Sequence, residues 1–234
     1  MEMFSEKDIL YEDNHLLVIN KHAGDLVQAD AQGQTGLEDE IKRFIRRRDN
    51  KPGDVFLGVV HRIDRPVSGA VLFAKTGKAL VRLNEMIRTG AIDKRYWAVV
   101  EALPEEHQGT LTHYIERDGK TNRSHAYASP RGDAKLAKLE YRLLAGSNNY
   151  FLLEVHLLTG RHHQIRCQLA KIGCPIKGDL KYGAKRSNPD GGICLHSRSL
   201  SFIHPVRKEP LTVTAPVPAD DNLWNFFAES VRSK

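Results

Sequence analysis

The stretch HRIDRPVSGAVLFAK (residues 61–75) places a cluster of charged side chains directly before an uninterrupted apolar segment. Its second part, GAVLFAK (69–75), has the length and composition of a strand that is buried on both faces. Thr76 follows as a helix N-cap residue, and apolar residues then recur at helical spacing as far as Gly90. The stretch therefore predicts a buried strand followed by an amphipathic helix, with polar groups held at the start of the strand.

The rest of the chain alternates short strand patterns with a few helices. Residues 9–21 predict two strands around a turn, and Val55–Val60 is a further apolar strand pattern. Thr35 and Glu38 have the spacing of a capping box before a helix that ends in three arginines. The remaining patterns predict strands at 94–101, 111–116, 123–128, 137–144, 150–158, 193–203 and 211–215, and helices at 160–172 and from about Asp221. The expected fold is α+β, with a mixed, mostly antiparallel central sheet and flanking helices in one domain spanning 1–234.

The composition excludes several classes of protein. Of the 234 residues 41% are hydrophobic and 27% are charged, and no apolar run approaches the ~20 residues that cross a bilayer. Three cysteines are too few and too odd in number for a disulfide framework. The acidic N-terminus lacks the basic head and apolar stretch of a signal peptide. We therefore expect a cytoplasmic protein in a reducing compartment, without a membrane segment.

The charge is distributed unevenly along the chain. Residues 1–60 contain 8 Lys/Arg and 12 Asp/Glu, a net of −4, whereas the remaining 174 residues contain 27 and 17, a net of +10. Between Arg161 and Arg186 there are seven basic residues and a single acid, Asp179. We call this segment the basic stripe, and it fits a surface that holds a phosphate backbone. A solvated lysine face would have the same composition.

Asp64 is the first candidate for chemistry. His61, Arg62 and Arg65 surround it in the sequence. If this segment lies in a cleft, the neighbouring cations keep the carboxylate ionised, as a nucleophile or a general base requires. The alternative is a surface turn, since Asp and Ser before Gly commonly form loops.

The second candidate segment is TGRHHQIR (159–166). With Thr159 as N-cap of a helix, Ile165 lies on the buried face and Arg166 at its edge. A buried guanidinium there requires a carboxylate partner, whereas a surface arginine would cover the core with its aliphatic stem.

A metal site is an alternative interpretation of this region, from the residues His162, His163, Cys167 and Cys174. Adjacent histidines point about 100° apart on a helix, and the sequence has no Cys-x-x-Cys pair. A zinc site is therefore disfavoured.

The third candidate segment is KRYWAVV (94–100), on a predicted strand. Tyr96 shares a face with Lys94 by the two-residue alternation of a strand. An aromatic ring beside a cation can stack a nucleobase. The alternative is a half-buried core tyrosine.

Together these segments resemble the RluA-like family of pseudouridine synthases. HRIDRPVSG is similar to the family's HRLDxxTSG signature, and LLTGRHHQIRCQLAKIGCPIKGDLKYG (157–183) is similar to its TGRxHQIR…GDxxYG block. The opening strand pair, KRYWAVVE and LHSRSLSFIHPVRKEPLTVTAPVP resemble further blocks in the same order. On these ordered blocks the chain is identified as a member of the family.

The resemblance implies the catalytic fold of this family, with a central basic cleft, and an isomerase that acts on RNA. In the reaction the bond between uracil N1 and the ribose breaks, the base turns, and it is rejoined through carbon 5. Because substrate and product are isomers, we expect no cofactor and no metal. The expected partner is a stem-loop of ribosomal or transfer RNA whose target uridine leaves its stack, and the enzyme is expected to act as a monomer.

The resemblance also implies roles for individual residues. Asp64 is the catalytic carboxylate, and Arg166 pairs with it. Tyr96 stacks on the target base, with its hydroxyl as the proton acceptor at carbon 5. Ile165 forms an apolar wall, and Arg62 fills the place that the flipped base leaves in the RNA. Further substrate contacts are expected from His61 and, together with the basic stripe, from Lys21, Arg65, Lys94 and Arg161.

Three positions depart from the family's pattern. His22 stands in place of proline in the first turn, and Val67 and His162 stand in place of threonine. Val67 removes a hydroxyl that would lie near Asp64. The chain starts directly with the catalytic-domain pattern, so we expect target recognition without the separate N-terminal RNA-binding module that many relatives carry.

Two other functions are alternatives for this sequence. One is a non-catalytic RNA-binding or ribosome-assembly module, for which loss of the carboxylate at Asp64 would be expected. The other is a glycoside hydrolase with Asp64 as nucleophile and an acid such as Glu154. That enzyme needs its two acids at a set separation, and it leaves the basic stripe without a purpose.

Overall fold

The computed structural model describes residues 4–30 and 33–233, whose strands form one 11-stranded sheet. The strand order is β1-β2-β4-β10-β5-β9-β8-β6-β7, and β3 and β11 pair with β4 and β10 off this path. The strands are Ile9–Glu12 (β1), Leu16–Lys21 (β2), Gly58–Val59 (β3), Ser68–Ala74 (β4), Asp93–Val100 (β5), Gln108–Asp118 (β6), Arg123–Tyr127 (β7), Lys135–Gly146 (β8), Phe151–Leu157 (β9), Leu195–Ile203 (β10) and Pro210–Thr214 (β11). Among these strands only β4 and β10 pair in parallel. The prediction of a mixed, mostly antiparallel sheet in an α+β fold is confirmed.

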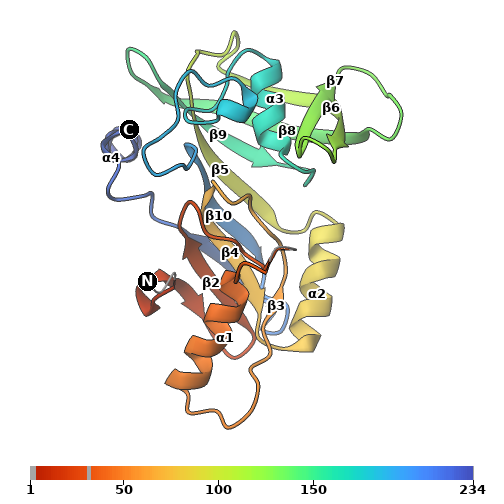
Figure 1. Ribbon diagram of the computed structural model, residues 1–234, viewed down its shortest axis with the longest axis vertical. Helices are drawn as coiled ribbons and strands as arrows, with labels where there is room; N and C mark the ends of the chain where they lie inside the picture. The colour runs from red at the N-terminus through yellow and green to blue at the C-terminus, as the bar shows by residue number, and fades with distance from the viewer. Residues whose placement is uncertain (1–3, 31–32, 234) are drawn as a thin grey trace.

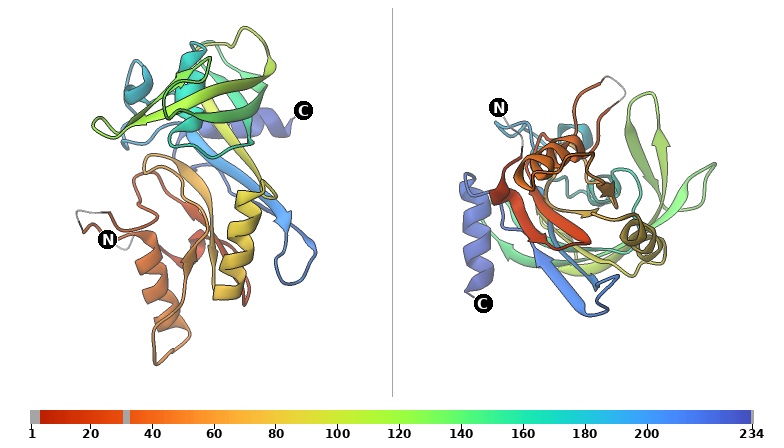
Figure 2. Two further views of the ribbon diagram at one scale, coloured as in Figure 1. Left: turned by 90° about the vertical axis from the view of Figure 1, so that its right-hand side faces the viewer. Right: turned by 90° about the horizontal axis from the view of Figure 1, so that it is seen from below.

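The helices flank two halves of this sheet. They are Leu37–Arg48 (α1), Gly77–Arg88 (α2), Gln164–Lys171 (α3) and Asn222–Arg232 (α4), with 3₁₀ turns at Glu6–Asp8 (η1) and Leu180–Tyr182 (η2). Figure 1 shows β1, β2, β4, α1 and α2 in the lower half and β6 to β9 with α3 in the upper half. The long strands β5 and β10 run between the halves, as the left view of Figure 2 also shows.

The strand predicted from the GAVLFAK segment, β4, is buried along its whole length. Val71 belongs to the apolar core that also contains Ile41 of α1, whereas Leu72 belongs to a second cluster with Leu83 of α2. The continuous apolar sequence is thus explained by cover on both faces of the strand. Glycine is required at position 69, near the start of β4. Its φ is +108°, and a Cβ there would lie 2.3 Å from the backbone oxygen of Ser197 in β10.

Two predictions for the elements that precede β4 are wrong. Helix α1 has Gly36 as its N-cap without a side-chain hydrogen bond, so the capping box of Thr35 and Glu38 does not form. A Cβ at this glycine would clash with the backbone of the preceding loop, which explains why no larger capping residue stands there. Within Val55–Val60 only Gly58–Val59 forms a strand. Gly58 pairs with Ala74, the last residue of β4, so the antiparallel register places residues 55–57 beyond the end of that strand.

Of the helices described between residues 4 and 233, none combines the length and apolar character that crossing a bilayer requires.

Candidate active site

A cleft of about 850 Å³ opens where the two halves of the sheet meet. Its walls come from three stretches that are far apart in the sequence, at 26–30, 60–67 and 160–166, with further residues from β5 and the β6–β7 hairpin. The stretch 60–67 is the polar part of the segment that precedes β4. Two of the three candidate segments thus meet in one cavity, and Tyr96 of the third also lines it.

Asp64 is held in a tight turn on this wall. The backbone N–H of Val67 donates to the Asp64 carbonyl at 3.0 Å, and β4 begins at the next residue, Ser68. The Asp64 side chain is 29% exposed and lines the cleft. The turn that was the alternative interpretation is therefore present, but it carries its carboxylate into a cavity rather than onto an open surface.

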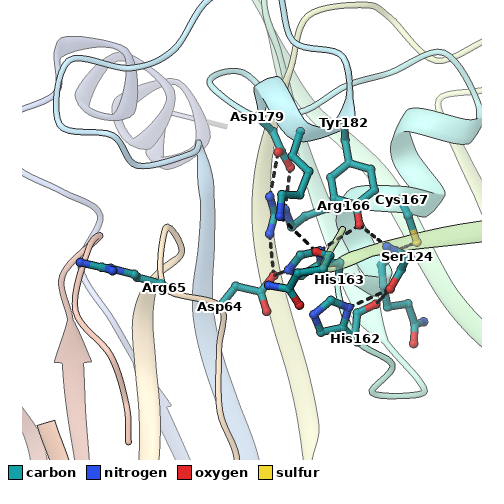
Figure 3. A network of polar contacts seen from close by, with 12 residues as sticks. Asp64, Arg65, Ser124, His162, His163, Arg166, Cys167, Asp179 and Tyr182 are labelled. Carbon is teal, nitrogen blue, oxygen red and sulfur yellow. Dashed lines mark hydrogen bonds and ion pairs between the residues drawn. The ribbon is translucent and has the colours of Figure 1, made fainter. Parts of the chain in front are cut away.

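Arg166 reaches Asp64 from helix α3. Its Nη1 donates to Asp64 Oδ2 at 3.1 Å, and the arginine is 5% exposed (Figure 3). Thr159 does not cap α3 as predicted. Its Oγ1 accepts from the backbone N–H of Lys138 at 2.8 Å, so it is tied to β8, and the helix begins only at Gln164.

Asp179 is the second partner of Arg166, and the sequence reasoning missed it. Its carboxylate accepts from Arg166 Nε at 2.7 Å and from Nη2 at 2.8 Å, and it is 1% exposed (Figure 3). Burial acts to lower the pKa of Arg166, but the hydrogen bonds and charges of Asp179 and Asp64 raise it above its usual value. The guanidinium therefore stays charged. Two features of the sequence mark Asp179: it is the only acid in the basic stripe, and it is the aspartate of the GDxxYG block.

A histidine is also close to Asp64. His163 Nε2 lies 3.6 Å from Asp64 Oδ2, and its Nδ1 lies 2.9 Å from the Tyr182 hydroxyl. That hydroxyl accepts from the backbone N–H of Ser124 at 2.7 Å. Burial, followed by the charge of Arg166, lowers the pKa of His163 to about 2, so the ring is neutral. The neighbouring His162 stacks on it, with ring centroids 3.8 Å apart.

Tyr96 and Ile165 line the cleft as largely apolar surfaces, each 5% exposed. Burial raises the pKa of Tyr96 to about 12, so its hydroxyl is protonated at neutral pH. His61 also lines the cleft, and its Nε2 accepts from the Leu72 backbone N–H at 3.3 Å. Burial and the charge of Lys94 lower the pKa of His61 to about 4. His61 is therefore a neutral side chain whose ring nitrogen is already engaged with β4.

The cleft is lined by more cations than anions. Two aspartates, Asp30 and Asp64, face seven basic residues, which are Arg62, Arg65, Lys94, Arg117, Arg161, Arg166 and Lys181. Of the basic stripe only the last three of these line the cleft, so the stripe is not one continuous track. Arg117, on β6, was not predicted. Arg65 donates from Nε to the Gly24 carbonyl at 2.9 Å and points away from Asp64 in Figure 3.

Lys21 does not face the cleft, which corrects its predicted contact with RNA. It is 1% exposed, and its Nζ donates to the carbonyls of His22, Asp25 and Arg65 at 2.8 to 3.0 Å. Burial lowers the pKa of Lys21 to about 8. The ammonium ties the first turn to the Asp64 turn, so Lys21 supports the site from behind.

The residues considered for zinc do not form a metal site. Cys167 and Cys174 are buried free cysteines. Within residues 4–30 and 33–233 no group of three or more His, Cys, Asp or Glu side chains is arranged to hold a metal ion.

A basic cleft with one carboxylate held by a buried guanidinium indicates an enzyme that acts on nucleic acid. Comparison with known proteins gives the particular family, because the sequence profile described as RNA pseudouridylate synthase matches residues 15–171. The chain is 33% identical over 219 residues to an uncharacterized RNA pseudouridine synthase of Bacillus subtilis, covering 93% of this chain and 70% of the relative. It is 37% identical over 227 residues to the ribosomal large subunit pseudouridine synthase D of Xylella fastidiosa, covering 91% and 66%. The chain belongs to the RNA pseudouridylate synthase family, whose members are isomerases.

The fold agrees with this assignment. The solved structure of human RNA pseudouridylate synthase domain containing 4 superposes with a TM-score of 0.76 at 23% identity, over 97% of this chain and 93% of that one. The predicted family and fold class are thus confirmed, and neither a glycoside hydrolase nor a non-catalytic module is favoured. The chain spans 66–70% of the length of the two curated relatives named above.

Proposed function

We propose that the chain converts a uridine of structured ribosomal RNA into pseudouridine in the cleft around Asp64. The observation that carries this proposal is the Asp64 carboxylate, partly open to the cleft and paired with the buried Arg166 guanidinium. Ribosomal RNA is favoured over transfer RNA because the curated relatives include ribosomal large subunit pseudouridine synthases C and D.

Asp64 is proposed as the catalytic carboxylate. Arg166 keeps one of its oxygens in a charge-assisted hydrogen bond, and Asp179 holds Arg166 in place from the buried side. The guanidinium thus stabilises the ionised carboxylate without covering it from the cleft. The N1–C1′ bond of uridine then breaks next to Asp64, and a new bond joins C1′ to carbon 5. The proton of carbon 5 is lost and N1 gains one, so the reaction is balanced without a cosubstrate.

Tyr96 and Ile165 are proposed to form the base pocket. Both line the cleft with apolar surface, and an aromatic ring stacks on a uracil of either orientation. With a pKa of about 12, the Tyr96 hydroxyl enters the reaction as a neutral hydrogen-bonding group. Its predicted role as the proton acceptor therefore requires that it pass on its own proton when it takes one from carbon 5.

The cations that line the cleft are proposed to hold the RNA backbone around the flipped uridine. Arg62 is exposed two residues before Asp64 and lines the same cleft, which suits a guanidinium that enters the space left by the base. Lys94, Arg161 and Lys181 line the cleft from other elements, and Arg65 extends the charge away from Asp64. Because β5 and β10 run through both halves of the sheet, we propose that residues 1–234 act as one catalytic domain.

The proposed function is tested with unmodified transcripts. The purified chain is incubated with large-subunit ribosomal RNA and, separately, with a pool of transfer RNA, both in the presence of a metal chelator. Chemical mapping of pseudouridine is expected to show one or a few converted positions in the ribosomal transcript. Conversion in transfer RNA alone would overturn the ribosomal assignment, and release of free uracil without pseudouridine would indicate a hydrolase.

A further inference from the structure

Both contacts to the Asp64 carboxylate fall on the same oxygen. Arg166 Nη1 donates to Oδ2 at 3.1 Å, and His163 Nε2 lies 3.6 Å from that same atom (Figure 3). In the part of the chain that the structure describes, no hydrogen bond or ion pair joins Oδ1 to a protein group. The carboxylate is therefore held from one side, and its two oxygens have different surroundings.

The proton on His163 is directed by its hydrogen-bond chain. The Tyr182 hydroxyl already accepts from the Ser124 backbone N–H at 2.7 Å, and His163 Nδ1 at 2.9 Å is the other group that the described structure places at this hydroxyl. The hydroxyl therefore donates its proton to Nδ1. In a neutral imidazole the remaining proton then lies on Nε2, the nitrogen that faces Asp64.

The backbone at His163 is adapted to this orientation. His163 is the N-cap of α3 and has a left-handed conformation, with φ of +51°, which is unfavourable for a residue with a Cβ. This conformation starts the helix and aims the ring at Asp64 at the same time. His162 stacks on the ring with an interplanar angle of 23°, and Tyr182 packs against it edge-on at 5.6 Å. A strained residue whose ring is fixed by two neighbours at a reactive carboxylate is typical of a functional role.

We propose that His163 is a positioning residue which donates its Nε2–H to Asp64 Oδ2 when RNA occupies the cleft. With Oδ2 fixed by His163 and Arg166, Oδ1 is the oxygen presented to the ribose and uracil. The distance of 3.6 Å is longer than a hydrogen bond, but such contacts commonly shorten when substrate binds. Asp64 is partly exposed on a turn, so a small rotation of its side chain closes the gap. This inference rests on the proposed function for the identity of the substrate and the reaction, whereas the hydrogen-bond chain that orients His163 does not depend on it.

The first test needs no RNA. In the full chain labelled with ¹⁵N-histidine, two-bond ¹H–¹⁵N correlations identify which ring nitrogen carries the proton, and His163→Gln assigns the signals. Burial is the main effect that opposes protonation of the ring, followed by the charge of Arg166 and by His162, Lys181 and Arg117. The Asp64 carboxylate, 3.6 Å from Nε2, acts in the opposite direction. We expect a neutral ring with its proton on Nε2 from about pH 5 to pH 8, the range in which an ordinary histidine titrates. In Tyr182→Phe the two tautomers should mix. A proton on Nδ1 in the wild type, or titration within this range, would overturn the proposal.

The second test separates positioning from binding in single-turnover conversion. His163→Leu should lower the rate of conversion by about 10- to 100-fold with RNA affinity unchanged, as expected for a misplaced reacting group. His163→Gln keeps an N–H donor and should recover much of that loss. Tyr141→Phe is the matched control for Tyr182→Phe, because its hydroxyl donates to the Glu106 carbonyl at 3.1 Å outside the cleft.

The outcomes distinguish the two proposals. A folded His163→Leu that reacts at the wild-type rate would refute the positioning role. If that variant does not fold, the tautomer of the wild type and the rate of Tyr182→Phe decide. A wild-type chain that converts no RNA would refute the proposed function, whereas the tautomer measurement would still accept or reject the hydrogen-bond chain.

Discussion

Replacing Asp179 with asparagine is predicted to destabilise the protein far more than the same change at Asp64. Asp179 is 1% exposed and makes two hydrogen bonds to a guanidinium that is itself 5% exposed. Removing one charge of a buried pair costs about 3–5 kcal/mol, because the other charge is left uncompensated. Asparagine keeps the shape and one acceptor oxygen, so we expect about 3 kcal/mol, a fall in Tm of roughly 6–12 °C for a chain of this size.

Asp64→Asn should behave differently. The Asp64 side chain is 29% exposed, and an ion pair that water reaches is worth about 0–1 kcal/mol. Arg166 keeps both hydrogen bonds to Asp179 in that variant. Asp64→Asn should therefore unfold close to the wild-type midpoint and yet lose conversion of RNA.

Urea unfolding followed by the fluorescence of Trp97 and Trp224, both buried, measures the two free energies. A double-mutant cycle compares Arg166→Met, Asp179→Leu and the variant that carries both changes. Removing both buried charges should cost less free energy of unfolding than removing either alone. Equal losses for Asp64→Asn and Asp179→Asn, or a loss below about 1 kcal/mol for Asp179→Asn, would refute the assignment of Asp179 as the structural partner.

Four further predictions concern separate parts of the site. Lys21→Met should lower the free energy of unfolding by about 1–3 kcal/mol, because three backbone carbonyls lose their donor, without changing the salt dependence of RNA binding. Lys181→Gln should instead reduce the slope of log affinity against log salt by about 1 in a filter-binding titration and leave stability unchanged. Burial lowers the pKa of His196 from 6.5 to about 4, so below pH 6.5 the unfolded chain takes up a proton at this residue that the folded chain does not. Between pH 6.5 and 4 His196 should lower the free energy of unfolding by up to ~1.4 kcal/mol per pH unit, in addition to the contributions of His61 and His163, whose pKa values burial also lowers. His196→Gln should make the slope shallower by the His196 contribution in urea titrations at several pH values. Tyr96→Phe should lower single-turnover conversion by about 100-fold or more, with RNA affinity measured in the same titration unchanged, if the hydroxyl takes part in proton transfer.

Local patterns were sufficient to predict most of the fold. The apolar run before Thr76 and the N-cap at Thr76 mark β4 and α2, and Thr76 Oγ1 does accept the backbone N–H of Ala79 at 3.2 Å. Such signals depend only on residues that are close to one another in the sequence. The capping box at Thr35 failed because the preceding loop packs onto Gly36, a contact that no local pattern encodes.

The site was less predictable than the fold because its partners come from distant elements. Asp64 and Arg166 were singled out by residue type and by resemblance, and the structure brings them together across 102 positions. Asp179 belongs to the GDxxYG block and is the only acid of the basic stripe, but neither feature shows which of the surrounding cations it pairs with. Lys21 was assigned to the surface by its charge, whereas three carbonyls bury it.

The role of His163 depends on backbone geometry rather than on residue type. The prediction of a helix from residue 160 placed His163 inside the first turn, where its ring would follow the helical spacing. Its left-handed φ of +51° instead turns the ring toward Asp64. Propensity gives no warning of such a conformation in a histidine, because it is maintained by the contacts with His162 and Tyr182.

Single-turnover conversion by Asp64→Asn tests the central claim most directly. The variant is compared with Asp133→Asn, a matched change in the exposed loop between β7 and β8, on the ribosomal transcript that the wild type converts. We predict that Asp64→Asn binds this RNA with wild-type affinity and forms no detectable pseudouridine, while Asp133→Asn converts it fully. Full conversion by folded Asp64→Asn would show that the reaction does not depend on this carboxylate.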